Sequence, residues 1–164
     1  MNVIDNFLEE EEFKKIRKTF LSIRFPWFIS EIIDDKSFKE NKILNIQLCN
    51  LLFKNKKIRN DLAFDLVKPI LKKINCTELY RVKANMNFGD LDPVLSSFHV
   101  DTSSPGLTGI YYINTCNGYT LFEEGGIKVD SVANRMLIFD NKLRHTGVTC
   151  SDNKLRVVIN FNWR

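Results

Sequence analysis

The sequence predicts an α+β fold in which N-terminal helices cover one face of a larger β-sheet. Helix-like apolar spacing fills residues 1–75, and short β-rich runs separated by Gly, Pro, Asn and Asp follow in residues 78–163. Regularly interrupted runs of this kind are typical of a sandwich or jelly roll. At 164 residues the chain is expected to form one domain, with residues 1–75 as a helical buttress and residues 78–163 as the jelly-roll core.

The first expected helix follows Asp5 and Asn6, either of which is a favourable N-cap residue. The apolar side chains that recur at three- and four-residue steps are Phe13, Ile16, Phe20 and Ile23. Pro26 ends the pattern because proline cannot continue the hydrogen-bond ladder of a helix. We therefore expect a helix that buries one stripe in the core.

A second helix is predicted by apolar residues spaced four apart, namely Ile58, Leu62, Leu66, Ile70 and Ile74. Such a row lies along one side of a helix, so that side is expected to pack against the sheet. Pro69 falls inside the row and is expected to kink or split the helix.

The first and last strands of the expected core, residues 81–88 and 156–163, alternate in the same way. One face of each is apolar, and the other carries Arg81, Lys83, Asn85 and Asn87, or Arg156, Val158, Asn160 and Asn162. If the apolar faces pack against the helices, Arg156 points into the barrel, where its guanidinium requires an anion such as a carboxylate. The alternation alone fits the opposite orientation equally well, with Arg156 on the solvent surface.

Charge and cysteine usage narrow the class of protein. The net charge is +4, with basic clusters at residues 14–18, 54–59 and 72–73. Acidic residues are interspersed, which favours solvated helix faces over a phosphate-backbone patch. The four cysteines are scattered without a Cys-x-x-Cys pair, and no secretory or membrane-spanning segment is evident. We expect a cytoplasmic protein that does not bind membranes.

The chain has two histidines, and both fall where a non-haem iron site needs them. His99 and Asp101 point to the same face of a strand because side chains alternate, and His145 lies farther along the chain. Two imidazoles and one carboxylate form the facial triad of Fe(II) oxygenases, which leaves three coordination positions open. An acidic residue falls two places after a His about one time in eight by chance, so the triplet is weak by itself.

In the order of these features, residues 78–163 resemble the 2-oxoglutarate/Fe(II) dioxygenases of the prolyl-hydroxylase-like group, of the type found in phages and marine microbes. His99 and Asp101 resemble the family's first two iron ligands, His145 its distal ligand, and Arg156 its cosubstrate-anchoring arginine. The segments that resemble core strands of the family are residues 109–114, 118–122 and 134–139. The resemblance implies a double-stranded β-helix (jelly roll) with N-terminal helices packed on the larger sheet, and location in the host cytoplasm if a phage encodes the protein.

The resemblance also implies the cofactors: Fe(II), 2-oxoglutarate and O2, with ascorbate as an optional reductant. Many relatives carry a Ser two residues after the anchoring arginine, where this chain has Val158. The oxygen-sensing prolyl hydroxylases are similar in lacking that Ser and use a tyrosine, which points to Tyr112, while Lys154 is the alternative anchor. Asn85 and Asn87 are placed either to donate amide hydrogens to the oxo-acid or to cap the strand.

Three classes of function stay open. The first is a dioxygenase that hydroxylates a peptidyl (prolyl-like) or small-molecule substrate and releases succinate and CO2, with a nucleic-acid-directed dealkylase or hydroxylase of the same superfamily as its variant. The second is a hydrolytic Zn(II) protein, because Zn(II) also binds two imidazoles and a carboxylate. The third is a non-catalytic jelly-roll metal-binding module. Arg156 and Tyr112 favour the first class, because a hydrolase needs no carboxylate clamp across the cavity.

Overall fold

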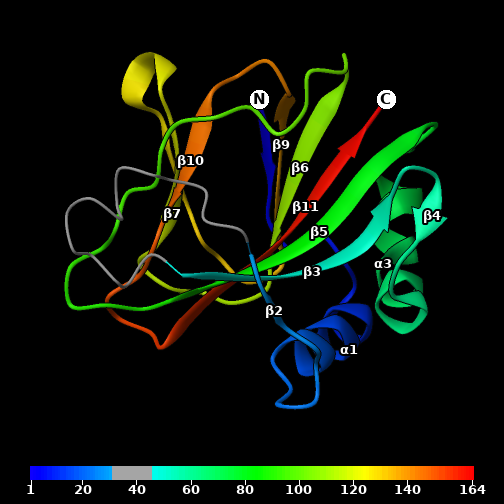
Figure 1. Ribbon diagram of the computed structural model, residues 1–164, viewed down its shortest axis with the longest axis horizontal. Helices are drawn as coiled ribbons and strands as arrows, with labels where there is room; N and C mark the ends of the chain where they lie inside the picture. The colour runs from blue at the N-terminus through cyan, green and yellow to red at the C-terminus, as the bar shows by residue number, and fades with distance from the viewer. Residues whose placement is uncertain (31–45) are drawn as a thin grey trace.

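The computed structural model describes residues 1–30 and 46–164, which form two facing antiparallel sheets (Figure 1). The larger sheet has the order β1 (Asn2–Ile4), β9 (Arg135–Asp140), β6 (Leu107–Tyr112), β11 (Leu155–Trp163), β5 (Leu79–Phe88), β3 (Gln47–Lys54) and β2 (Phe28–Ile29), with β4 (Lys57–Ile58) beside β3. The smaller sheet has the order β10 (His145–Val148), β7 (Tyr119–Phe122) and β8 (Lys128–Asp130). This is the predicted jelly roll, a double-stranded β-helix.

Two helices, α1 (Glu10–Phe20) and α3 (Asp61–Lys73), lie on the side of the larger sheet away from β7 and β10 (Figure 1). Ring contacts join Phe13 of α1 to Tyr111 of β6, and Phe64 of α3 to Phe53 of β3. These contacts belong to one apolar core between the helices and the sheet. No helix in the described part of the chain is long and apolar enough to cross a membrane.

The details of α1 differ from the sequence prediction. Glu9 occupies the N-cap position without a side-chain hydrogen bond, and Asp5 instead forms an ion pair with Arg135 of β9. The helix ends at Phe20, so Ile23 lies beyond its buried stripe and is fully exposed. The predicted cap and the last member of the predicted row were therefore wrong.

The buried face of α3 was predicted only in part: Ile70 is buried and Leu66 and Ile74 pack against the core, but Ile58 and Leu62 do not join it. Asn60 caps the helix by accepting a hydrogen bond from the Ala63 amide, which leaves Ile58 before the helix, in β4. With this start, the residues that face the core are Ala63, Phe64, Val67 and Ile70, whereas Leu62 is 73% exposed. The helix runs without interruption through Pro69, contrary to the predicted split.

Residues 1–75 are not a purely helical layer, because β1 and β3 are integral strands of the larger sheet. β1 pairs with β9, and β3 pairs with β5 along most of its length. The turn from β3 to β4 contains Asn55 and Lys56, both with positive φ, as in a tight hairpin of mirror-image type. The strand was missed because its polar and apolar residues do not alternate cleanly.

β5 and β11 are paired through the middle of the larger sheet and position most of the polar residues discussed below. Their register places Arg81 opposite Asn162, Lys83 opposite Asn160, Asn85 opposite Val158, and Asn87 opposite Arg156. The alternate residues, among them Val82, Ala84, Val157 and Ile159, lie in the core beneath the helices. The predicted orientation of the two strands is therefore confirmed: their polar faces look toward the space between the sheets.

Candidate functional site

Both histidines and Asp101 converge at one end of the space between the sheets. The ligand atoms of His99, Asp101 and His145 all lie within 4.8 Å of one another, and His99 Nε2 is 3.8 Å from Asp101 Oδ1. Backbone pairing brings the two histidines together, because His99 and His145 exchange two N–H···O bonds of 3.0 Å. The structure thus gathers the three residues that the sequence assigned to a metal.

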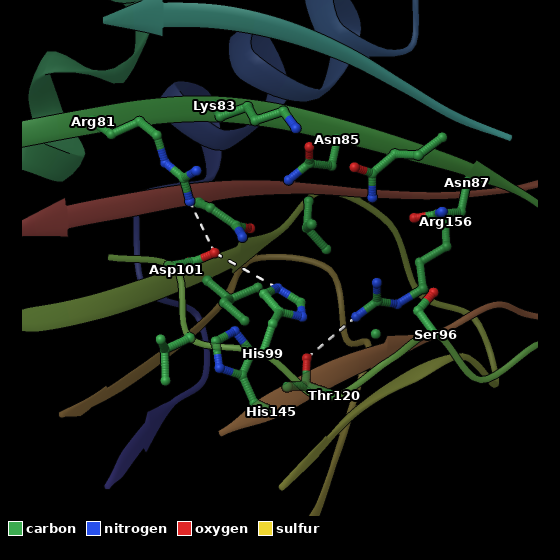
Figure 2. Close-up of a pocket in the computed structure, with 16 residues that line it drawn as sticks. Arg81, Lys83, Asn85, Asn87, Ser96, His99, Asp101, Thr120, His145 and Arg156 are labelled. Atoms are coloured by element: carbon green, nitrogen blue, oxygen red, sulfur yellow. Dashed lines mark hydrogen bonds and ion pairs between the residues drawn. The ribbon is translucent and has the colours of Figure 1, made fainter. Parts of the chain in front are cut away.

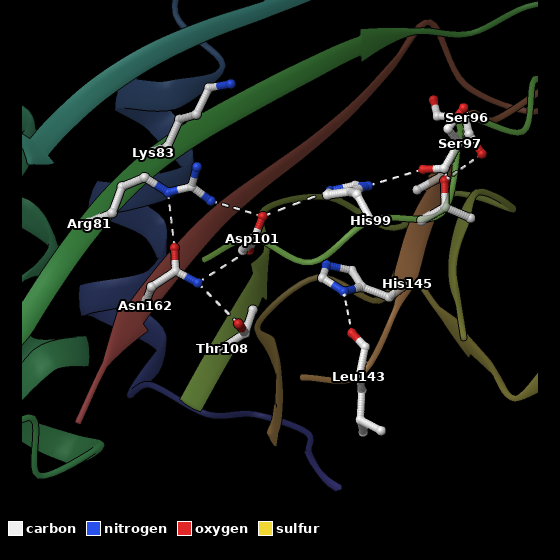
Figure 3. A network of polar contacts seen from close by, with 12 residues as sticks. Arg81, Lys83, Ser96, Ser97, His99, Asp101, Thr108, Leu143, His145 and Asn162 are labelled. Atoms are coloured by element: carbon white, nitrogen blue, oxygen red, sulfur yellow. Dashed lines mark hydrogen bonds and ion pairs between the residues drawn. The ribbon is translucent and has the colours of Figure 1, made fainter. Parts of the chain in front are cut away.

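Each imidazole is oriented by a backbone carbonyl. His99 Nδ1 lies 3.0 Å from the Ser97 oxygen, and His145 Nδ1 lies 3.1 Å from the Leu143 oxygen (Figure 3). With its proton on Nδ1, each ring donates to that carbonyl and keeps the Nε2 lone pair for a metal. Burial lowers the pKa of His145 despite the opposing effect of Asp101, which favours the neutral imidazole that a metal requires.

Two side chains from neighbouring strands hold Asp101 (Figure 3). Arg81 Nη2 lies 2.8 Å from Asp101 Oδ1, and Asn162 Nδ2 donates to Asp101 Oδ2 at 3.3 Å. Asn162 also accepts a 2.9 Å hydrogen bond from Arg81 Nε, so the three groups orient one another. Burial is the largest single effect and acts to raise the pKa of Asp101, but the Arg81 guanidinium, the two histidines and the Asn162 hydrogen bond together outweigh it, so the pKa is lowered. Asp101, as a candidate metal ligand, is therefore an ionised and well-oriented carboxylate.

Arg156, at the other end of the space, is buried among neutral groups. Its Nε donates to Ser131 Oγ at 2.8 Å, and its Nη2 donates to Thr120 Oγ1 at 3.3 Å. No carboxylate forms an ion pair with Arg156 in the described part of the chain. Burial lowers the pKa of this guanidinium, which means that its charge is costly where it lies. A buried cation without a counter-ion marks a place for an anionic ligand.

Tyr112 lies near Arg156, but its hydroxyl contacts Thr120 and not the cavity. The guanidinium of Arg156 lies over its ring at 5.7 Å, but its hydroxyl is fully buried and hydrogen-bonded to Thr120 Oγ1 at 2.8 Å. Thr120 itself lines the cavity, whereas Tyr112 does not. Lys154, the alternative anchor, is exposed on the turn before β11. Ser131 is closer to the guanidinium but does not line the cavity, so the cavity-lining hydroxyl bonded to Arg156 is that of Thr120, which the sequence reasoning missed.

A single cavity of about 250 Å³ joins the two ends (Figure 2). The predicted cosubstrate contacts Asn85 and Asn87 line it together with the three candidate metal ligands, Thr120 and Arg156. The side-chain oxygens of Asn85 and Asn160 are buried in the protein without a hydrogen-bond partner. Unsatisfied amides of this kind in a cavity wall are available to a ligand.

A second group of metal-ligand types, Cys116, Cys150 and Asp152, also has atoms within 4.8 Å of one another. All four cysteines of the chain are free, and the Cys150 thiol donates a hydrogen bond of 3.3 Å to the Asn153 carbonyl oxygen. Burial raises the pKa of Cys150 to about 11. The third member of this group, Asp152, is exposed and already accepts a hydrogen bond from the Asn117 amide, and none of the three residues lines the cavity. The group at His99 is the better candidate.

No protein-family model matches the sequence, and no curated protein shows a significant match. Solved structures match the fold. A prolyl hydroxylase from Trichoplax adhaerens, in complex with a peptide fragment of the hypoxia inducible factor oxygen degradation domain, superposes with a TM-score of 0.68 and 16% identity, over 99% of this chain and 82% of that one.

Two bacterial structures are similar in the same way. An oxidoreductase of the 2OG-Fe(II) oxygenase family from Burkholderia pseudomallei gives a TM-score of 0.72 at 11% identity, covering 98% of this chain and 83% of that one. A prolyl-4-hydroxylase from Pseudomonas putida gives 0.64 at 10% identity, covering 99% and 91%. At these identities the likeness establishes the fold, so the function has to be argued from the site.

Proposed function

We propose that the protein is a 2-oxoglutarate- and Fe(II)-dependent dioxygenase that hydroxylates a peptidyl (prolyl-like) or small-molecule substrate. The observation that carries this proposal is a single cavity with a His, Asp, His group at one end and a buried arginine without a counter-ion at the other. A hydrolytic Zn(II) site would explain the first feature but not the second. The likeness to a prolyl hydroxylase with a bound peptide supports a peptidyl substrate.

His99, Asp101 and His145 would hold the Fe(II). Two imidazole nitrogens and one carboxylate oxygen are a donor set that suits this metal and leaves three coordination positions open. The Nδ1 contacts to backbone carbonyls fix both rings, and Arg81 with Asn162 fixes the carboxylate. Bound Fe(II) and 2-oxoglutarate together supply O2-dependent hydroxylation, with release of succinate and CO2.

Arg156 would bind the far carboxylate of 2-oxoglutarate. The planar guanidinium suits a carboxylate, and an anion here would relieve the cost of a buried, unpaired charge. Thr120 Oγ1 is the adjacent hydroxyl donor, and Tyr112 positions it through the 2.8 Å hydrogen bond between their hydroxyls. Asn85 and Asn87 would contact the oxo-acid from β5. Thr120 thereby takes the place of the Ser that Val158 replaces.

The test is formation of succinate from 2-oxoglutarate by protein reconstituted anaerobically with Fe(II) and then exposed to air. We expect slow turnover without a primary substrate, because cosubstrate decarboxylation needs only the metal, the anchor and an open position. Asp101→Ala should abolish it, and Asp152→Ala, an exposed residue outside the cavity, should not. If neither wild type nor Asp101→Ala forms succinate, and if 2-oxoglutarate does not affect Zn(II) binding, a non-catalytic metal-binding module would be favoured.

A further inference from the structure

Lys83 is a half-buried lysine in the cavity wall that the proposed reaction does not use. It lies on β5 between Arg81 and Asn85 (Figure 2), and its Nζ is 3.4 Å from the Ser30 hydroxyl, a long contact for a hydrogen bond. Within residues 1–30 and 46–164, no carboxylate forms an ion pair with it. Burial lowers the pKa of Lys83, so its charge, like that of Arg156, is held at a cost.

The described wall of the cavity has an excess of positive charge. Its cations are Arg81, Lys83 and Arg156, and its carboxylate is Asp101, which gives a net excess of two positive charges with neutral histidines. Fe(II) carries two positive charges and 2-oxoglutarate two negative ones, so the pair would leave this excess unchanged. Because Asp101 already pairs with Arg81, the surplus lies at Arg156 and Lys83.

The carboxylate bound by Arg156 is poorly placed to neutralise Lys83. Arg156 is opposite Asn87, and Lys83 is opposite Asn160, four residues away along β5. At about 3.3 Å per residue, the two positions are about 13 Å apart along the strand. With one carboxylate at the metal and the other bound by Arg156, 2-oxoglutarate has no carboxylate left for Lys83. Among the described residues, Lys83 is therefore left without a counter-ion when 2-oxoglutarate is bound, and a second anion is needed to neutralise it.

Neutral hydrogen-bonding groups surround Lys83. Asn160 is its cross-strand partner and Asn85 its neighbour on the same face of β5, and the side-chain oxygens of both lack a partner. Both residues are at least nine-tenths buried and line the cavity. The amide N–H groups of these residues can donate to the oxygens of an anion, whereas their unpaired carbonyl oxygens require a hydroxyl or another donor on the same ligand.

We propose that Lys83, with Asn85 and Asn160, forms an anion-binding subsite, and that the primary substrate carries a carboxylate or phosphate group that occupies it. The existence of the subsite stands on the wall of the cavity alone, whereas its assignment to the primary substrate rests on the proposed oxygenase function. Lys83 is then a specificity-determining residue.

Acetate and inorganic phosphate serve as separate probes, titrated into the Zn(II)-loaded protein with and without 2-oxoglutarate while backbone amide NMR resonances are followed. We expect saturable shifts centred on β5 near Lys83 that persist when 2-oxoglutarate is present. Lys83→Met should weaken probe binding about tenfold, the scale of one hydrogen bond to a charged group. Lys83→Arg keeps the charge and should retain binding, and Lys18→Met, on the exposed face of α1, should match wild type.

Tighter binding of phosphate than acetate would support a phosphorylated substrate, and the reverse a carboxylate substrate. The proposal is overturned if neither probe shifts β5 resonances, if Lys83→Met binds the probe as wild type does, or if Lys83→Met weakens 2-oxoglutarate as much as Arg156→Ala does. If 2-oxoglutarate fails to bind wild type while the probes still bind at Lys83, the oxygenase function falls and the anion subsite stands.

Discussion

The buried charges at the two ends of the cavity differ in whether the protein supplies a counter-ion. At the metal end, Asp101 has Arg81 as its counter-ion at 2.8 Å and Asn162 as a second partner. At the other end, Arg156 is equally enclosed, but its bonded partners are the hydroxyls of Thr120 and Ser131. A protein charge already balanced by protein needs no ligand to be stable, whereas an unbalanced one does. This difference supports the proposal that an anionic ligand binds at the Arg156 end.

The largest effect should come from the metal end. Asp101→Ala removes a ligand and leaves Arg81 beside the metal position, so Fe(II) affinity should fall more than about 100-fold, beyond the loss typical of an outer-shell change. Isothermal titration with Mn(II) as an oxygen-stable substitute would measure it. Asp130→Ala, an exposed change in β8, is the control. Near-normal metal binding by Asp101→Ala would mean that the cavity has no metal site built on this carboxylate.

Arg156→Ala should separate the two ends. It removes one partner of the proposed buried ion pair, so 2-oxoglutarate binding should weaken by about 2 to 5 kcal/mol, while metal affinity stays nearly unchanged. Both affinities can be measured on the same Mn(II)-loaded protein, with Lys154→Ala as the matched control at the exposed alternative anchor. Equal losses in both affinities would show that Arg156 supports the fold and not the cosubstrate.

Asn162→Leu tests how the Asp101 carboxylate is oriented, without changing the charge at the metal end. The side chain links Arg81 and Asp101 through bonds of 2.9 and 3.3 Å. Its loss should lower metal affinity roughly tenfold, the lower range for an outer-shell partner, and spare 2-oxoglutarate binding at Arg156. A urea unfolding curve would identify any general loss of stability. Unchanged metal affinity in a stable variant would argue that the backbone alone orients the carboxylate.

The smallest effects are expected from removing the hydroxyls of Thr120 and Tyr112, and their relative size shows which of the two contacts 2-oxoglutarate. Thr120→Val removes the hydroxyl that faces the guanidinium. It should weaken the binding of 2-oxoglutarate by about 0.5 to 1.5 kcal/mol, the usual net value of one hydrogen bond. Tyr112→Phe should cost less, because its hydroxyl contacts Thr120 and not the cavity. Competition binding against 2-oxoglutarate would compare the two. A larger loss in Tyr112→Phe would restore Tyr112 as the direct contact.

Strand alternation carried most of the correct prediction. The period of two in residues 81–88 and 156–163 specified which side chains share a face, and the expected packing of the apolar faces against the helices then assigned the polar faces to the cavity. Helix faces were predicted less well, because at 3.6 residues per turn a row of residues spaced four apart drifts around the helix by about 40° per step. That is how Ile58 and Leu62 were assigned to a core that they do not join.

The residues that complete the site were beyond reach of the sequence. Thr120 on β7 and Ser131 meet Arg156 of β11 only through pairing between distant segments. Arg81 and Asn162 were expected to face the cavity, but their joint hold on Asp101 depends on β5 and β11 being neighbours in register. Hydroxyl and amide side chains are common, so their spacing along the chain does not reveal which of them meet.

Anaerobic titration with Fe(II), with and without 2-oxoglutarate, would show whether the cavity binds the metal and the cosubstrate together. We expect a metal-to-ligand charge-transfer absorption that requires both components, disappears in Asp101→Ala, and needs far more 2-oxoglutarate in Arg156→Ala. Fe(II) binding with no such absorption at any 2-oxoglutarate concentration would contradict this expectation, because the metal group and the unpaired arginine would then not serve one ligand.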